Sequence, residues 1–147
     1  MSYVRLIASC LLALPGCVTS GSAKLESTQP PLPVVSGQKY AGIIVPRFER
    51  FADSWTPTEE QVFSAEPRIQ ECILSKHKEL RSTLPRYFRQ YSGWSEHGRS
   101  VLKVQLFDTR TYRVEELRLP LVVCDGDQDN SYFYVSLDLE SKACIIY

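Results

Sequence analysis

The sequence predicts a single α+β domain, in which one kinked helix packs on an antiparallel β-sheet of four or five strands. Apolar residues recur with the period of a helix between residues 62 and 80. From Leu84 onward the spacing changes to the alternation of β-strands. About 130 residues remain after an N-terminal export signal, enough for one domain and too few for two.

Residues 1–16 have the three parts of an export signal. Arg5 is the charge of the first part, and an apolar run follows that is shorter than the ~20 residues of a transmembrane helix. The Leu-Pro-Gly-Cys segment that ends at Cys17 then resembles the lipobox of bacterial lipoproteins, with an aliphatic residue three places before the cysteine. The segment that ends at Cys10 fits the same pattern, but a cut there would leave too short an apolar run.

The lipobox resemblance implies that the chain is cut before Cys17 and that Cys17 carries the lipid. Each buried methylene contributes about 0.8 kcal/mol, so two or more acyl chains hold a protein firmly at a membrane. Val18 rather than Asp follows the cysteine. By resemblance to the enterobacterial sorting rule, this points to the outer membrane, with the domain facing the periplasm.

Residues 17–38 are expected to form the lipidated cysteine and a flexible linker, which leaves residues 39–147 as the folded domain. Ser, Gly and Pro without apolar periodicity, as in residues 29–33, cannot bury a core. The formal net charge of the whole chain is +0. This balance argues against general nucleic-acid binding, which needs a basic excess.

The helix is predicted to begin at a capping box. Thr56 would cap it, Pro57 would occupy the first helical position and Glu59 the third. Pro67 interrupts the apolar period and predicts a kink or a restart, because proline lacks the N–H that the helix needs. Before the helix, Tyr40–Phe51 is expected to be an extended segment that enters the domain.

The second half of the domain reads as short strands joined by turns, which favours antiparallel pairing and a helix on one face of the sheet. Turns are expected near Gly93–Gly98 and over Asp125–Asn130. The expected strands are Tyr87–Ser92, Val101–Phe107, Leu119–Cys124, Ser131–Leu139 and, at the edge, Ala143–Tyr147.

This order of elements resembles the cystatin-like layout, a helix across a curved antiparallel sheet. Four stretches also resemble a family of small uncharacterised bacterial secreted proteins, namely residues 55–58, 87–93, 98–107 and 125–126 with the Tyr132 that follows. The family pattern has Asp-Gly-Gly at the last of these turns, where this chain has Asp-Gly-Asp. The resemblance implies a fold and no activity.

The mature chain keeps Cys72, Cys124 and Cys144 beside Cys17. An exported protein meets an oxidising compartment, where disulfides form. We expect Cys72 to pair with Cys124 or with Cys144, linking the helix to the sheet. The alternative is three unpaired cysteines that act as small buried apolar residues.

No residue pattern identifies a catalytic or metal site, so we expect no enzyme activity and no cofactor. The acidic segment 125–130 resembles a calcium loop, but the twelfth position is Ser136 rather than the required Glu. A solvated turn and weak calcium binding both remain open there. His77 and His97 are the only histidines, without the spacing of a zinc site or a catalytic triad.

One face of the sheet is a candidate partner-binding surface. If Phe133 and Val135 face the helix, the residues that alternate with them point outward. Tyrosine and arginine are favoured at interfaces, although tyrosine also has a high β propensity, which is the alternative explanation. The candidate residues are Tyr87, Arg89, Tyr91, Lys103, Tyr132 and Tyr134.

These observations predict a lipid-anchored protein of the bacterial envelope that acts as a non-catalytic protein-binding module, for instance an inhibitor of a hydrolase or toxin. Two alternatives stay open. One is a structural accessory of the envelope without a discrete ligand. The other is a carrier of a small ligand, or an enzyme, with a cleft between helix and sheet.

Overall fold

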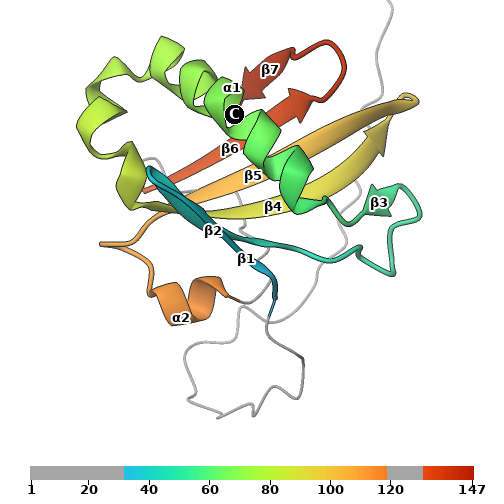
Figure 1. The fold of residues 1–147 in the computed structure, drawn as a ribbon, viewed down its shortest axis with the longest axis horizontal. Helices are drawn as coiled ribbons and strands as arrows, with labels where there is room; N and C mark the ends of the chain where they lie inside the picture. The colour runs from blue at the N-terminus through green and yellow to red at the C-terminus, as the bar shows by residue number, and fades with distance from the viewer. Residues whose placement is uncertain (1–31, 119–130) are drawn as a thin grey trace, which may run out of the picture.

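The computed structural model describes residues 32–118 and 131–147, which form an α+β fold (Figure 1). Helix α1 (Glu59–Lys76) lies across one face of a seven-stranded, mostly antiparallel sheet. The predicted class is confirmed, but the sheet has more strands than the four or five expected. Its strands are β1 (Val34–Gly37), β2 (Tyr40–Ile44), β4 (Tyr87–Glu96), β5 (Arg99–Asp108), β6 (Tyr132–Asp138) and β7 (Cys144–Ile146) in spatial order, with β3 (Ser54–Trp55) paired to β4.

Strands β4, β5 and β6 form an antiparallel meander at the centre of the sheet. β4 and β5 pair over ten residues each, from Tyr87 opposite Asp108 to Glu96 opposite Arg99. The turn between them has positive φ at His97 (52°) and Gly98 (77°), as two-residue hairpin turns that match the strand twist require. The predicted turn is confirmed at Glu96–Gly98, but Gly93, which was also expected in a turn, lies inside β4. The strand and acidic turn predicted over residues 119–130 lie outside the described residues.

The N-terminal hairpin of β1 and β2 was not predicted. β1 lies inside the segment expected to be linker, yet Val35 is only 1% exposed and packs in the core. The linker prediction is therefore wrong at its C-terminal end, and the boundary at residue 39 would cut off a strand. β2 pairs with β4 in parallel, because the chain crosses the sheet through α1 between the two strands.

Helix α1 begins two residues later than predicted. Thr58 is the N-cap: its hydroxyl accepts from the Gln61 N–H (3.2 Å), and its own N–H donates to the Gln61 side chain (2.8 Å). The capping box thus exists, but with other residues. Thr56 instead accepts a hydrogen bond from the backbone N–H of Arg47 (2.8 Å). The helix is not restarted at Pro67, which lies inside a single continuous segment.

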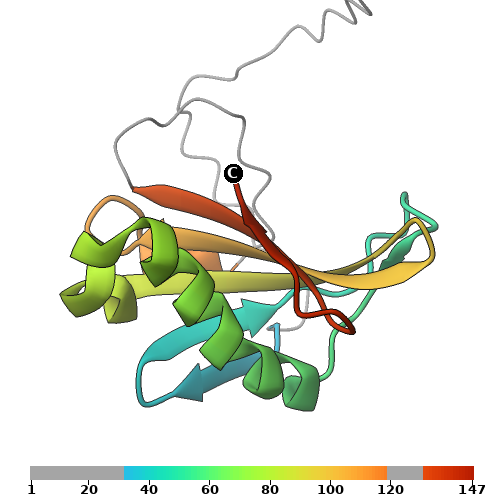
Figure 2. The same ribbon diagram turned by 90° about the horizontal axis from the view of Figure 1, so that it is seen from above.

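Two apolar clusters lie on opposite faces of the sheet. The larger fills the space between α1 and the sheet, and Figure 2 shows α1 running along one side of the central strands. The smaller lies on the outer face, the face turned away from α1. It is built around Phe88, Phe107 and Leu117, the last from the short helix α2 (Val114–Leu117). This smaller cluster with α2 covers only part of the outer face.

A disulfide joins Cys72 of α1 to Cys144 of β7. This confirms one of the two predicted pairings and the link from helix to sheet. The bridge spans 72 positions of the sequence and ties the edge strand to the helix. Cys124 lies outside the described residues. Within the described part of the chain, no helix has the length and apolar character to cross a bilayer.

Candidate functional site

Three of the six candidate partner-binding residues are buried on the helix side of the sheet. Tyr87, Arg89 and Tyr91 are at most 2% exposed, so the prediction that they point outward is wrong. Alternation along β4 allows two assignments of its faces, and the sequence reasoning chose the wrong one. In the structure, Phe88 faces the outer apolar cluster, which turns its neighbours Tyr87 and Arg89 toward the helix.

A buried ion pair explains how an arginine can occupy that position. Arg89 Nε lies 3.1 Å from Glu66 Oε1 of α1, and both side chains are at most 2% exposed. The Tyr91 hydroxyl donates to the same oxygen (2.6 Å), and Gln70 donates to the other carboxylate oxygen (3.1 Å). Burial, with the nearby negative charge of Glu66, raises the pKa of Tyr91 well above its usual value. This cluster holds helix to sheet and offers no surface to a partner.

Lys103 and Tyr134 do point to the outer face, as predicted. They belong to a row of side chains from several elements that we call the outer aromatic strip. Lys103 Nζ lies 4.7 Å from the centre of the Trp94 ring, and the rings of Tyr134 and Tyr147 lie 5.3 Å apart. The strip comprises Phe48, Phe51, Trp94, Lys103, Tyr134 and Tyr147.

The aromatic strip is partly exposed. Phe51 is 51% exposed and packs against Trp94, with ring centres 5.4 Å apart, while Tyr147 is 70% exposed. Lys103 also binds Glu96 through an Nζ–Oε1 contact of 2.6 Å. Burial lowers the pKa of Lys103, but the hydrogen bond to Glu96 and the neighbouring Tyr134 outweigh it and raise the pKa above its usual value. The lysine is therefore a fixed positive charge among aromatic rings.

The sixth candidate, Tyr132, belongs to the smaller apolar cluster. Its ring packs 5.2 Å from Phe107, centre to centre, and is half-buried there. Of the six predicted residues, the structure thus brings two into one exposed surface. The sequence reasoning missed Phe48, Phe51 and Trp94. The first two lie in the connection between β2 and β3, where no periodicity indicates which way a side chain points.

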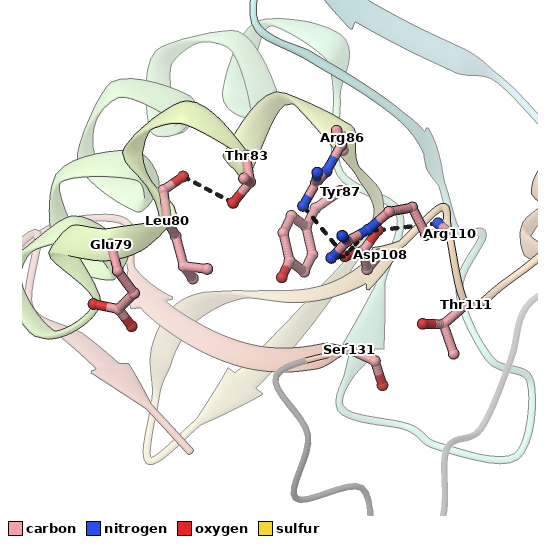
Figure 3. A pocket seen from close by; sticks show the side chains of 9 residues that line it. All are labelled: Glu79, Leu80, Thr83, Arg86, Tyr87, Asp108, Arg110, Thr111 and Ser131. Atoms are coloured by element: carbon pink, nitrogen blue, oxygen red, sulfur yellow. Dashed lines mark hydrogen bonds and ion pairs between the residues drawn. The ribbon is translucent and has the colours of Figure 1, made fainter.

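A polar pocket of about 490 Å³ opens at the end of the sheet where β4 begins and β5 ends (Figure 3). Its wall includes the 3₁₀ segments Lys78–Ser82 and Leu84–Arg86, the turn after β5 and the start of β6. It does not lie between α1 and the sheet, where the sequence analysis placed a cleft. Its lining residues are Glu79, Leu80, Thr83, Arg86, Tyr87, Asp108, Arg110, Thr111 and Ser131.

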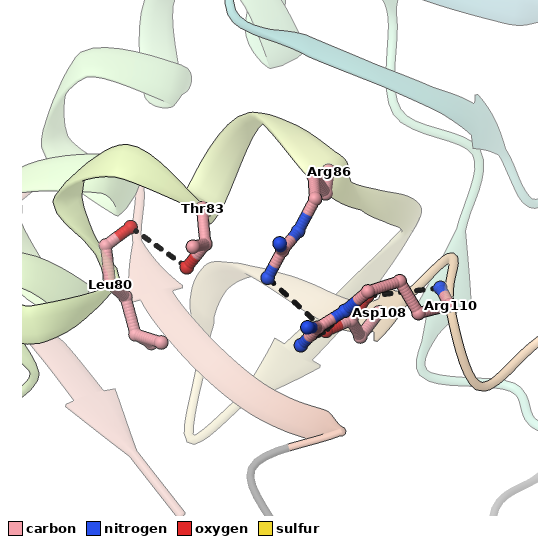
Figure 4. Close-up of polar contacts among 5 residues, drawn as sticks. All are labelled: Leu80, Thr83, Arg86, Asp108 and Arg110. Atoms are coloured by element: carbon pink, nitrogen blue, oxygen red, sulfur yellow. Dashed lines mark hydrogen bonds and ion pairs between the residues drawn. The ribbon is translucent and has the colours of Figure 1, made fainter.

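Two arginines converge on one buried carboxylate in this pocket (Figure 4). Arg110 Nη2 lies 2.7 Å from Asp108 Oδ2, and Arg110 Nε and backbone N–H also bond to the carboxylate. Arg86 Nη2 lies 3.6 Å from the same Oδ2. The hydrogen bonds from Arg110, with the charges of both arginines, lower the pKa of Asp108. One negative charge therefore faces two positive charges.

The two histidines lie in different parts of the fold. The ring of His77 packs against Phe133, with ring centres 5.0 Å apart, and His97 lies in the hairpin turn. Among residues 32–118 and 131–147, no three His, Cys, Asp or Glu side chains gather as a metal site would need. The acidic segment with the calcium-loop resemblance lies outside those ranges.

No protein-family model, no curated protein and no solved structure matches this chain.

Proposed function

We propose that this protein is a non-catalytic binding module that holds a protein partner through the outer aromatic strip. The observation that carries the proposal is the row of partly exposed aromatic rings around Lys103 on the outer face, beside the smaller apolar cluster, against which Phe48 also packs. Aromatic side chains offer large contact areas with little conformational freedom to lose, and they are enriched where proteins bind each other.

The charges in the strip support a protein partner over a purely apolar one. Lys103 and Glu96 are bound to each other at 2.6 Å, and both stay accessible to solvent. Such a pair at the rim of an aromatic surface sets the orientation of a partner more than its affinity. Because the one carboxylate of this pair is held by the lysine, it is poorly suited to act as a general base. We therefore propose that this surface binds a partner and carries out no reaction.

We place this module, as part of the same proposal, at a bacterial envelope membrane. The support is the pattern of residues 1–17, which resembles a lipoprotein signal with lipidation at Cys17. The absence of Asp after Cys17 favours the outer membrane, with the domain facing the periplasm. The cystatin-like layout and the resemblance to small secreted bacterial proteins belong to the proposal too, supported by a helix lying across a mostly antiparallel sheet.

A matched pair of exposed phenylalanines tests the binding surface. Phe51 lies in the strip and is 51% exposed, whereas Phe63 lies on α1 and is 45% exposed. The full-length protein would be used as bait in a detergent extract of envelopes, beside Phe51→Ala, Tyr134→Ala and Phe63→Ala. We expect one saturable partner that is lost with Phe51→Ala and Tyr134→Ala and kept with Phe63→Ala. Retention by all three variants, or equal loss, would overturn the assignment of the surface.

Arg89→Ala is not a suitable variant for this test, although Arg89 was a candidate partner-binding residue. Arg89 is buried against Glu66, so its removal would weaken the fold and reduce any binding indirectly.

The pocket beside Asp108 favours a second candidate function, a carrier of a small ligand.

A further inference from the structure

The pocket at the end of the sheet has a surplus of positive charge at its inner wall. Asp108 is 3% exposed and is already saturated by Arg110, which reaches both of its oxygens. Arg86 adds a second guanidinium, whose nearest charged partner is that same carboxylate at 3.6 Å. This separation is too long for a hydrogen bond, so the guanidinium of Arg86 is only loosely engaged.

Arg86 also carries an unsatisfied donor. Its Nε is buried and has no hydrogen-bond partner among the described residues. A buried donor without an acceptor is costly, and such atoms in folded proteins mark places where water, an ion or a ligand belongs. The guanidinium lines the pocket wall, as Figure 3 shows. The Arg86 side chain is 37% exposed, so an acceptor in the pocket can bind its guanidinium while Arg110 keeps its bonds to Asp108.

We propose that this pocket binds a small polar ligand through one oxyanion, a carboxylate or a phosphate group, held by Arg86. The planar guanidinium presents donors in a fork that matches either group. A volume of about 490 Å³ lies within the range of ligand pockets, and much of the wall is polar. The pocket shares no residue with the outer aromatic strip, so ligand binding and partner binding can be tested separately.

The opposite end of the pocket restricts the ligand to a single oxyanion. Glu79 lies there, across the pocket from the arginines, and its side chain is 64% exposed (Figure 3). A polyanion that extended from Arg86 toward Glu79 would bring like charges together, which is unfavourable. Thr83 and Thr111 also line the pocket, and their hydroxyl groups suit a hydroxylated or amide-bearing ligand.

The test uses the full-length protein in non-ionic detergent near pH 7, with inorganic phosphate and acetate as separate probes. Sodium chloride keeps the ionic strength constant, so that general screening does not vary. A ligand that binds only the folded protein raises the melting temperature with concentration. We expect a saturable rise with at least one probe, and the tighter-binding probe identifies the group. No saturable rise with either probe would overturn the proposal.

Two variants of Arg86 and one control make the test specific. Arg86→Gln removes the charge, while Arg86→Lys keeps the charge but loses Nε. Both leave Asp108 bound to Arg110, so both should fold. Loss of charged hydrogen bonds is expected to weaken binding by roughly tenfold or more in each. Arg47→Gln, an exposed arginine outside the pocket, should bind as the unaltered protein does. Unchanged affinity in Arg86→Gln or Arg86→Lys would overturn the role of Arg86.

Discussion

The two faces of the sheet carry similar residues, which are buried on one face and partly exposed on the other. On the helix side, Arg89 and Tyr91 are buried under α1 and bind Glu66. On the outer side, Lys103 and Tyr134 carry a comparable cation and phenol, yet they stay partly exposed beside other aromatic rings. The comparison teaches that residue type alone does not separate a structural cluster from a binding surface. What separates them is whether another element covers the face.

The ion pairs of the two faces make this contrast measurable. The side chains of Arg89 and Glu66 are at most 2% exposed, whereas those of Lys103 and Glu96 are 21% and 42% exposed. A buried charge that loses its partner keeps the full cost of its removal from water, and an exposed charge does not.

Removal of Glu66 should have the largest effect. Glu66→Ala leaves Arg89 charged and buried, and we expect the free energy of unfolding to fall by about 3–5 kcal/mol. Urea denaturation followed by circular dichroism measures the change. Glu96→Ala, on the outer face, is the matched control and should cost about 1 kcal/mol or less. Equal losses in both variants would break the distinction between the faces.

Removal of the disulfide should come second. In Cys72→Ala combined with Cys144→Ala, the unfolded chain regains the freedom that a 72-residue loop had lost, and we expect a loss of about 2–4 kcal/mol. The double variant avoids a stray thiol. Denaturation of the unaltered protein with and without a reducing agent provides the comparison. A loss of stability smaller than that of Glu96→Ala would contradict a stabilising role for the link between β7 and α1.

The cap of α1 should contribute less. Thr58→Ala removes the hydroxyl that accepts from Gln61, and we expect a loss of about 1 kcal/mol. Thr56→Ala is the control, since Thr56 bonds outside the helix and its loss should leave α1 intact. Thermal denaturation, followed by the circular dichroism signal of the helix, distinguishes the two variants. A larger loss of helix in Thr56→Ala would favour the cap position predicted from the sequence.

The smallest change is expected on the outer face. Lys103→Gln removes a partly exposed ion pair and a cation–π contact, and should cost about 1 kcal/mol or less. Because salt screens exposed charges, the difference from the unaltered protein should shrink between low and high salt. Melting curves at two salt concentrations measure it. A loss as large as that in Glu66→Ala would show that the strip holds the fold together.

Several features of the fold could be predicted from local pattern. The alternation of residues 101–107 and 131–139 predicted β5 and β6, and Glu96–Gly98 predicted the turn before β5. These signals are local, since a period of two and a glycine with positive φ depend on neighbours in the sequence. The pairing of Cys72 with Cys144 was one of two open choices, and only their proximity in the fold decides between them.

The sequence by itself determined the class of the fold, the central strands and the presence of one long helix, because hydrophobic period and turn chemistry act over a few residues. Only the tertiary structure decided which face of β4 the helix covers, because both assignments satisfy the same alternation. The buried partner of Arg89 lies on another element, at Glu66. The pocket likewise joins Arg86, Asp108 and Ser131, which are distant in sequence and meet only when the strands pair.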